Sequence, residues 1–164
     1  MVNKAVKFIG IAALVIIIDQ IIKNFANKLE QPINLIGNVV KITFLKNYGA
    51  SFGIFKNQTW LFILFSIIVI AAIIYYYKKI PNEYFTWIAL IFGGTIGNLI
   101  DRLRFAYVID FMDFTYWPVF NIADVALVLG AGVIIYKILR KKEHKKKIVD
   151  KSKKSKKKIS KKKK

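Results

Sequence analysis

The chain has 164 residues, of which 55% are hydrophobic, and its 28 Lys and Arg outnumber nine Asp and Glu to give a formal net charge of +19. It contains no cysteine, which excludes disulfides, thiol nucleophiles and cysteine-based metal sites. The hydrophobic residues lie in long runs, and apolar runs of about 20 residues are typical of transmembrane helices.

Four apolar runs predict four transmembrane helices. In chain order they cover residues 5–26, 59–77, 84–102 and 119–139. The first run follows Lys4 and Lys7, as the apolar core of a secretory signal peptide would. It continues past Asp19 to about Ala26 without a persuasive small-x-small cleavage site, so we expect a retained first helix.

The distribution of positive charge predicts the topology. Residues 137–164 hold 17 Lys and Arg against two acidic residues, whereas the rest of the chain carries a net charge of only +4. The positive-inside rule therefore places both termini and the turn at residues 78–83 in the cytoplasm, with residues 27–58 and 103–118 outside. We expect residues 1–140 to form one polytopic membrane domain. Residues 141–164 are predicted to be a disordered, solvated tail that touches anionic lipid headgroups.

Three acidic residues fall in the predicted helices, all near the outer face: Asp19, Asp101 and Asp124. Charged groups in a bilayer are unfavourable unless they pair or meet water, so these residues are functional candidates. Asp19 is spaced to pair with Lys23, so it can instead belong to an ion pair at the membrane edge. Arg102 directly follows Asp101, and we expect these two residues to pair and brace the helix end. Asp124 has no basic residue one turn away, and Asp110 on the outer loop is available as its partner.

The sequence leaves few side chains for catalysis. The only histidine, His144, lies in the lysine-rich tail, which excludes a Ser-His relay within the membrane, and no HExxH or P-loop motif is present. Two aspartates that lie close together share a proton, and such a pair can activate water while it protonates a leaving amide. That reaction is peptide hydrolysis by an aspartic mechanism. Asn98 and Asn121, three residues before Asp101 and Asp124, are placed to orient the carboxylates or bind a substrate backbone.

Five stretches of the sequence together resemble one known family. They are "DQIIK" at 19–23, "KNYGASFGIF" at 46–55, "GGTIGNLIDR" at 93–102, "YVIDF" at 107–111 and "FNIAD" at 120–124. In this order they closely resemble bacterial lipoprotein signal peptidase (signal peptidase II), over residues 5 to about 139.

The resemblance implies a membrane-embedded aspartic endopeptidase with no metal or organic cofactor. The family removes the signal peptide from prolipoproteins just before a cysteine that carries diacylglycerol. The resemblance also implies that Asp110 and Asp124 form the catalytic dyad. The other positions that match residues shaping or supporting the site are Asp19, Lys23, Asn47, Gly49, Asn98, Asp101, Arg102, Asn121 and Ala123.

The predicted fold is an all-α membrane protein with four transmembrane helices and a small extracytoplasmic β-sheet between the first two. The resemblance implies that this sheet lies on the membrane surface, and the alternation from Val39 to Leu45 is compatible with strands. We expect a monomer in the bacterial cytoplasmic membrane, with its active site near the extracytoplasmic face. The expected partners are diacylglyceryl-prolipoproteins and membrane lipids, and not nucleic acid.

One departure from the family lies between Asp110 and Asp124, where "FMDFTYWPVFNIA" is shorter than is usual. Within it, Asp113 is expected to be a solvated loop residue. Two other functions stay open at this stage. A small transporter or channel subunit would also carry intramembrane acids, but it would place them near the bilayer midplane. In this chain the acids are expected near one face of the membrane. A membrane-anchored protein could also act through its lysine tail on nucleic acid or anionic lipid.

Overall fold

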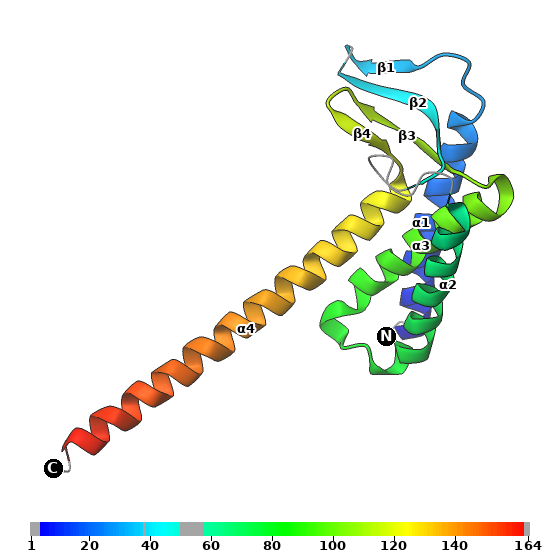
Figure 1. Cartoon of the computed structure of the whole chain (residues 1–164). Coiled ribbons are helices and arrows are strands. Elements are labelled where there is room, and N and C mark those ends of the chain that lie inside the picture. Colours follow the sequence, from blue (N-terminus) through cyan, green and yellow to red (C-terminus); the bar gives the residue numbers. More distant parts are fainter. Residues whose placement is uncertain (1–3, 38, 50–57, 163–164) are drawn as a thin grey trace. The chain divides into compact units, whose positions relative to one another are not determined.

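The computed structural model describes residues 4–37, 39–49 and 58–162 (Figure 1), and the chain divides into two compact units, Met1–Ala131 and Gly132–Lys164. The helices are α1 (Lys4–Ala26), α2 (Thr59–Tyr76), α3 (Phe85–Phe105) and α4 (Ile122–Lys162), with the 3-10 turns η2 (Tyr77–Lys79) and η3 (Asn82–Tyr84) between α2 and α3. The strands are β1 (Ile33–Ile36), β2 (Val40–Asn47), β3 (Val108–Phe114) and β4 (Trp117–Phe120).

Three helical segments of the described residues are long and apolar enough to cross a membrane: Lys4–Ala26, Thr59–Lys79 and Ile122–His144. They agree with three of the four predicted spans. Helix α3 also occupies the remaining predicted span, residues 84–102, but its glycines and its polar residues Asn98, Asp101 and Arg102 lower its hydropathy. The four-span topology therefore stays a prediction.

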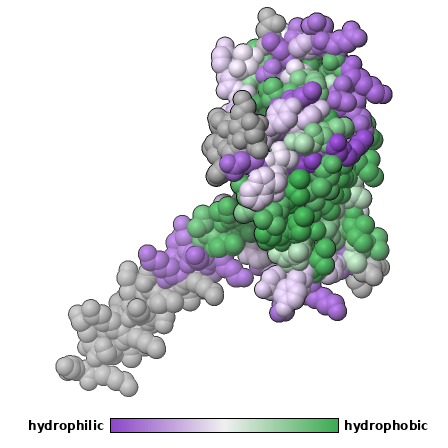
Figure 2. Space-filling view, turned by 45° about the vertical axis from the view of Figure 1, so that its right-hand side comes forward, coloured by the Kyte–Doolittle hydropathy of each residue, from purple (hydrophilic) through white to green (hydrophobic). Residues whose placement is uncertain are grey.

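The outer surface of the helices in the first unit is apolar, as a lipid environment requires. Helix α2 exposes Phe65 (71%) and Ile68 (55%), and α1 exposes Ile9 (65%). Figure 2 shows hydrophobic side chains gathered over the helices, with hydrophilic side chains concentrated towards the end that carries the sheet. Such a large apolar surface is rare on a soluble monomer and marks contact with lipid or another protein.

Helix α3 packs against its neighbours through glycines. An ideal Cβ on Gly93 would lie 2.9 Å from the carbonyl oxygen of Ala12 on α1, and one on Gly97 would lie 2.9 Å from a carboxylate oxygen of Asp19. A Cβ on Gly94 would overlap the carbonyl oxygen of Ala123 in the first turn of α4. The absence of side chains at these positions lets three backbones approach closely, as small residues do between membrane helices.

A methyl group on Gly94 should therefore destabilise the protein. We expect Gly94→Ala to lower the free energy of unfolding by about 1–3 kcal/mol, because the overlap is with backbone and cannot be relieved by a rotamer change. The matched control is Gly10→Ala on α1, where nothing lies within 4 Å, and which should be neutral or stabilising by up to about 1 kcal/mol. Thermal unfolding in detergent checks both, and equal midpoints for the two variants would contradict the packing described here.

The four strands form one antiparallel sheet in the order β1-β2-β3-β4. The prediction of strands around Val39 to Leu45 is confirmed, since β2 covers Val40–Asn47. The prediction was incomplete between α3 and α4, where the chain forms β3 and β4, and β4 takes the first two residues of the predicted span 119–139. Asp110 accordingly lies on a strand opposite Leu45 and not in a loop, and Asp113 lies half-buried on the same strand opposite Lys41.

Burial explains why β3 shows no strand pattern in the sequence. Four consecutive residues, Val108 to Phe111, are all buried, so the strand lacks the alternation of a half-exposed strand. Ile109 and Phe111 pack in a cluster with Ala26 at the end of α1. Before the strand, Ala106 adopts a left-handed conformation (φ 64°) that ends α3, as is common at the residue after a helix.

The second unit, Gly132–Lys164, is helical in its described part, because α4 continues to Lys162. This differs from the disordered tail expected for residues 141–164. Lysine has a favourable intrinsic helix propensity, so a lysine-rich segment can extend a helix that precedes it. The division of the chain at about residue 140 stays a prediction.

Candidate active site

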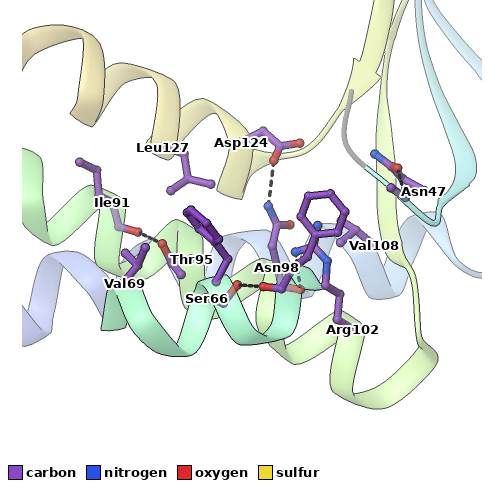
Figure 3. Close-up of a pocket in the computed structure, with 13 residues that line it drawn as sticks. Asn47, Ser66, Val69, Ile91, Thr95, Asn98, Arg102, Val108, Asp124 and Leu127 are labelled. Atoms are coloured by element: carbon purple, nitrogen blue, oxygen red, sulfur yellow. Dashed lines mark hydrogen bonds between the residues drawn. The ribbon is translucent and has the colours of Figure 1, made fainter. Parts of the chain in front are cut away.

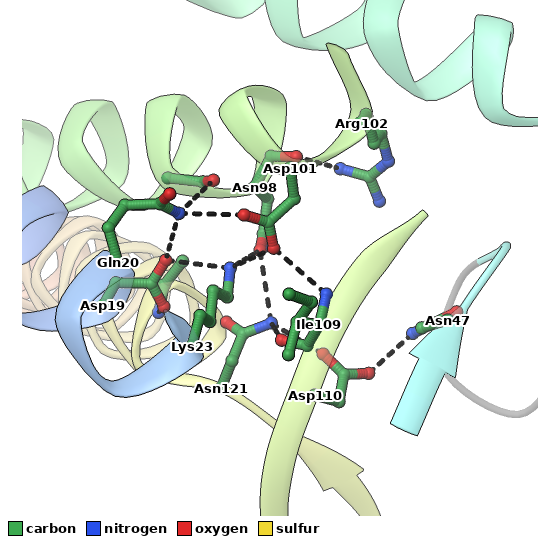
Figure 4. Close-up of polar contacts among 12 residues, drawn as sticks. Asp19, Gln20, Lys23, Asn47, Asn98, Asp101, Arg102, Ile109, Asp110 and Asn121 are labelled. Atoms are coloured by element: carbon green, nitrogen blue, oxygen red, sulfur yellow. Dashed lines mark hydrogen bonds and ion pairs between the residues drawn. The ribbon is translucent and has the colours of Figure 1, made fainter. Parts of the chain in front are cut away.

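Asp110, one of the two predicted dyad aspartates, is buried in the middle of β3 with an exposed fraction of 1%. Each of its carboxylate oxygens accepts a hydrogen bond from an asparagine side chain (Figure 4). The amide of Asn121 donates to Oδ1 at 2.7 Å, and the amide of Asn47 at the end of β2 donates to Oδ2 at 2.8 Å. The carboxylate is thus held on both sides by neutral donors from different elements.

Asp124, the other predicted dyad aspartate, lies in the first turn of α4. The side-chain amide of Asn98 on α3 donates to its Oδ1 at 2.8 Å (Figure 3), and the backbone N–H of Asn121 donates to its Oδ2 at 3.3 Å. In return, the Asn121 side chain accepts the backbone N–H of Asp124 at 2.9 Å. This reciprocal pair is a capping box, which begins α4 at Ile122 and places an acid at the positive end of the helix dipole.

The hydrogen-bond partners fix the orientation of all three asparagine amides. Asn98 accepts from the Lys23 ammonium, Asn121 accepts from the backbone N–H of Asp124, and Asn47 accepts from the backbone N–H of Gly49. Each of these partners can only donate, so it must face the amide oxygen. Every amide NH₂ group is thereby directed at a carboxylate, either Asp110 or Asp124.

The environment of Asp110 favours its protonated form. Burial raises the pKa of Asp110 to about 7, and the charge of Asp124 acts in the same direction, while the hydrogen bonds from Asn47 and Asn121 and the charge of Lys23 oppose both. Near neutral pH, this carboxyl therefore exchanges a proton readily. Such a group next to a second carboxylate is suited to proton transfer.

Lys23 lies buried between two acids. Its ammonium forms ion pairs with Asp19 at 2.8 Å and with Asp101 at 2.9 Å (Figure 4). The predicted Asp19–Lys23 pair is confirmed. The predicted pairing of Asp101 with Arg102 is wrong, because Asp101 pairs with Lys23 while the Arg102 guanidinium lies over the Phe62 ring, 4.9 Å from its centroid.

Gln20 was not among the predicted site residues, but its side chain lies within the same polar group. Its side-chain amide donates to Asp101 at 2.9 Å, to the Gly97 carbonyl at 3.2 Å and to Asp19 at 3.3 Å. Its place between Asp19 and Lys23 was a signal, since residues three apart lie on one helix face. A glutamine can serve as the neutral donor of a buried acid cluster.

A cavity of about 350 Å³ adjoins Asp124 between α2, α3 and α4 (Figure 3). Polar groups at one part of its wall include Asn47, Gly49, Asn98 and Arg102, and the remaining wall is mostly apolar, with Phe62, Phe65, Val69, Ile91 and Leu127. A second cavity of about 310 Å³ also reaches Asp124, from the side of β4, and its other lining residues are apolar apart from the backbone. Asp124 therefore faces two cavities whose walls are mostly apolar.

The remaining predicted site residues also lie in this region. Ala123 is fully buried, and its backbone N–H donates to Asp19 at 2.9 Å. Gly49 is buried beside Asn47. Within the part of the chain that the structure describes, no group of three or more His, Asp or Glu side chains is arranged to hold a metal ion. Part of the "KNYGASFGIF" stretch, residues 50–55, lies outside the described residues.

Helices with apolar outer surfaces that carry one buried and one half-buried aspartate define a membrane protein with a carboxylate site. The family model described as signal peptidase (SPase) II matches residues 11–140. The chain therefore belongs to the signal peptidase II family, a family of peptidases, as the five motifs predicted. This membership favours a peptidase over a transporter or a protein that acts through its tail.

Individual relatives and solved structures agree with this assignment. The lipoprotein signal peptidase of Halothermothrix orenii is 40% identical over 130 residues, which cover 76% of this chain and 90% of the relative. That of Streptococcus agalactiae is 44% identical over 128 residues, covering 73% and 83%. A solved structure described as a bacterial membrane enzyme, determined by the in meso method at 2.3 Å resolution, has a TM-score of 0.79 and 32% identity, and the match covers 85% of this chain and 91% of that one.

Proposed function

We propose that this protein is a membrane-embedded aspartic endopeptidase that removes the signal peptide from prolipoproteins, immediately before a cysteine that carries diacylglycerol. Asp110 and Asp124 form its catalytic dyad. The observation that carries the proposal is the convergence of two carboxylates, each held by asparagine donors, beside an apolar cavity in a chain of the signal peptidase II family. The relatives that are named lipoprotein signal peptidase support the substrate class.

The proposed reaction needs only the two carboxyl groups and water. The ionised carboxylate takes a proton from water as the water oxygen bonds to the substrate carbonyl carbon, which gives a tetrahedral intermediate. The protonated carboxyl then gives its proton to the amide nitrogen as the C–N bond breaks. The two groups share one proton and titrate as a unit, so neither acid nor base is assigned to one aspartate. No covalent intermediate, metal or organic cofactor takes part.

The proposed substrate lies with its acyl chains in lipid or between the helices, which keeps them out of water. Its peptide crosses the outer end of the helices beneath the sheet. The charge distribution supports cytoplasmic termini and a site near the extracytoplasmic face, because the basic residues are concentrated after residue 136. We propose that the chain acts as a monomer in the bacterial cytoplasmic membrane and does not bind nucleic acid.

A matched pair of substrates tests the proposed function. Purified protein in lipid is incubated with a synthetic prolipoprotein peptide, with and without diacylglycerol on its cysteine, and the products are identified by mass. We expect cleavage before the modified cysteine and little cleavage of the unmodified peptide. If folded protein leaves both peptides intact, the proposed activity is refuted. If it cuts both equally well, the proposed lipid requirement is refuted.

The pH dependence of activity follows from the environment of Asp110. Because the raised pKa of Asp110 is about 7, the shared proton is present below that pH and is lost above it. We expect kcat/KM to fall about tenfold for each pH unit above roughly pH 7. Rates from pH 5 to 9 with a non-titrating substrate check this, and a profile that is flat to pH 9 contradicts it.

The variant Asn47→Leu refines this test. Asn47 donates to the carboxylate form of Asp110 and lowers its pKa, so its loss should move the alkaline limb of the profile to higher pH. An unchanged limb would show that Asn47 does not hold the reacting carboxyl.

A further inference from the structure

Four residues form a compact polar group behind the dyad, named here the Lys23 cluster: Asp19, Gln20 and Lys23 on α1 and Asp101 on α3. Two donors in the cluster cross-link its two acids. The Lys23 ammonium contacts Asp19 and Asp101 at 2.8 and 2.9 Å, and the Gln20 amide donates to the same two side chains at 3.3 and 2.9 Å. Both acids are almost fully buried, so the cross-links are shielded from water.

The two acids also reach forward to the segments that carry the dyad. Asp19 accepts the backbone N–H of Ala123 at 2.9 Å, and Asp101 accepts that of Ile109 at 3.0 Å. Ala123 directly precedes Asp124, and Ile109 directly precedes Asp110. Each acid of the cluster therefore holds the peptide unit next to one dyad aspartate.

A third connection runs through side chains alone. Lys23 donates to Asn98 at 2.9 Å, and Asn98 donates to Asp124 at 2.8 Å. The same oxygen of Asn98 accepts from Asn121 at 3.2 Å, and Asn121 donates to Asp110. Hydrogen bonds between side chains thus connect the Lys23 cluster to both dyad carboxylates, through Asn98 to Asp124 and through Asn98 and Asn121 to Asp110.

We propose that the Lys23 cluster positions the two dyad aspartates relative to each other, with Gln20 and Lys23 as the positioning residues that hold its two acids together. This inference rests on the proposed dyad. A buried ion pair alone contributes little net stability compared with apolar packing, so holding α1 to α3 would not require these charges. The contacts that apolar residues could not replace are those to Ala123, Ile109 and Asn98, and all three lead to the dyad.

Two substitutions of Gln20 separate positioning from packing. Gln20 is half-buried, and Gln20→Leu keeps its bulk but removes the donor. We expect kcat to fall about tenfold and KM to change less than threefold, since a small misplacement of reacting groups reduces the rate far more than it reduces binding. The matched control, Gln31→Leu at an exposed position before β1, should leave kcat within twofold of the wild-type value.

The isosteric variant Gln20→Glu supplies a second measurement, the pH dependence of kcat, which a change in packing alone would not alter. The charged groups around this position are Asp19 and Lys23 on α1 and Asp101 on α3, while β3 and α4 contribute the N–H groups of Ile109 and Ala123. An ionised carboxylate here cannot donate, but a protonated one can. The ratio of variant to wild-type kcat should therefore rise as the pH falls from 8 to 5.5, whereas the ratio for Gln20→Leu should stay constant.

The variant Lys23→Met tests the second cross-link, with Lys28→Met at an exposed position as its control. We expect a loss of kcat of roughly 100-fold with little change in KM. Should Lys23→Met fail to fold, the two Gln20 variants decide the matter without it. Wild-type kcat in both Gln20 variants at every pH, or a loss confined to KM in any folded variant, overturns the inference.

The same assay separates this inference from the proposed function. If wild-type protein cleaves the lipidated peptide and Asp124→Asn does not, the dyad stands, and normal kinetics in the Gln20 variants refute only the positioning role. If Asp124→Asn cleaves at the wild-type rate, the proposed dyad fails first, and the positioning inference is refuted with it.

Discussion

Asn in place of Asp110 or of Asp124 is expected to lower kcat by at least about 10³-fold, because the amide cannot take or give a proton and the one remaining carboxyl group has lost its proton-sharing partner. The substitution keeps the size of the side chain. It also keeps one acceptor oxygen for the amide donors, Asn121 or Asn47 at Asp110 and Asn98 at Asp124. We therefore expect KM to change by only a few-fold and the variants to remain folded.

A control for this prediction lies on the same strand as Asp110. Asp113 is also on β3, half-buried and opposite Lys41, but outside the hydrogen-bonded network of the site as described. Asp113→Asn should retain activity within twofold of the wild-type protein. Circular dichroism and thermal unfolding establish that all three variants are folded before their rates are compared. Substantial activity in either dyad variant, or a comparable loss in Asp113→Asn, would show that the dyad is assigned wrongly.

Asn121→Leu is expected to lower kcat about 100-fold. Asn121 is fully buried and contacts both dyad aspartates: its side chain donates to Asp110 and accepts the backbone N–H of Asp124. Leucine would remove both contacts, leave part of the Asp110 carboxylate without a donor and weaken the cap of α4. The loss of a cap alone typically lowers stability by about 1 kcal/mol, so the protein should still fold.

The exposed Asn34 on β1 supplies the control for this variant, and Asn34→Leu should be as active as the wild-type protein. Kinetics with the lipidated peptide and thermal unfolding distinguish the possible results. A drop in the unfolding midpoint with unchanged kcat would mean that Asn121 serves only as a helix cap and does not orient the dyad.

Local sequence spacing predicted those parts of the site that lie within one element. The Asp19–Lys23 pair follows from positions four apart on one helix. The spacing of Asn121 and Asp124 indicated that the two residues lie one turn apart, but the capping box that they form was not predicted. The choice of Asp110 as the second acid came from the family resemblance. Asp110 and Asp124 lie on different elements, with β4 between them, so their separation in the sequence does not predict that they lie close together.

The parts that could not be predicted depend on contacts between distant elements. Asp101 was expected to pair with its neighbour Arg102, but the fold brings Lys23 from α1 to it across a glycine-lined helix contact. Strand β3 was missed because its residues are buried in succession, which removes the alternating pattern. Both errors have one cause, which is contact with an element that is distant in the sequence. Such a contact gave Asp101 a different ion-pair partner, and it buried both faces of β3.

The most direct test of the central claim is a single-turnover cleavage in H₂¹⁸O of the diacylglyceryl prolipoprotein peptide by the wild-type protein, followed by mass spectrometry of both products and of the protein. We predict one cut, immediately before the lipidated cysteine, with one ¹⁸O in the new carboxylate of the signal peptide and an unchanged mass of the protein. An adduct between the peptide and the protein, a cut elsewhere or an intact peptide would contradict the account.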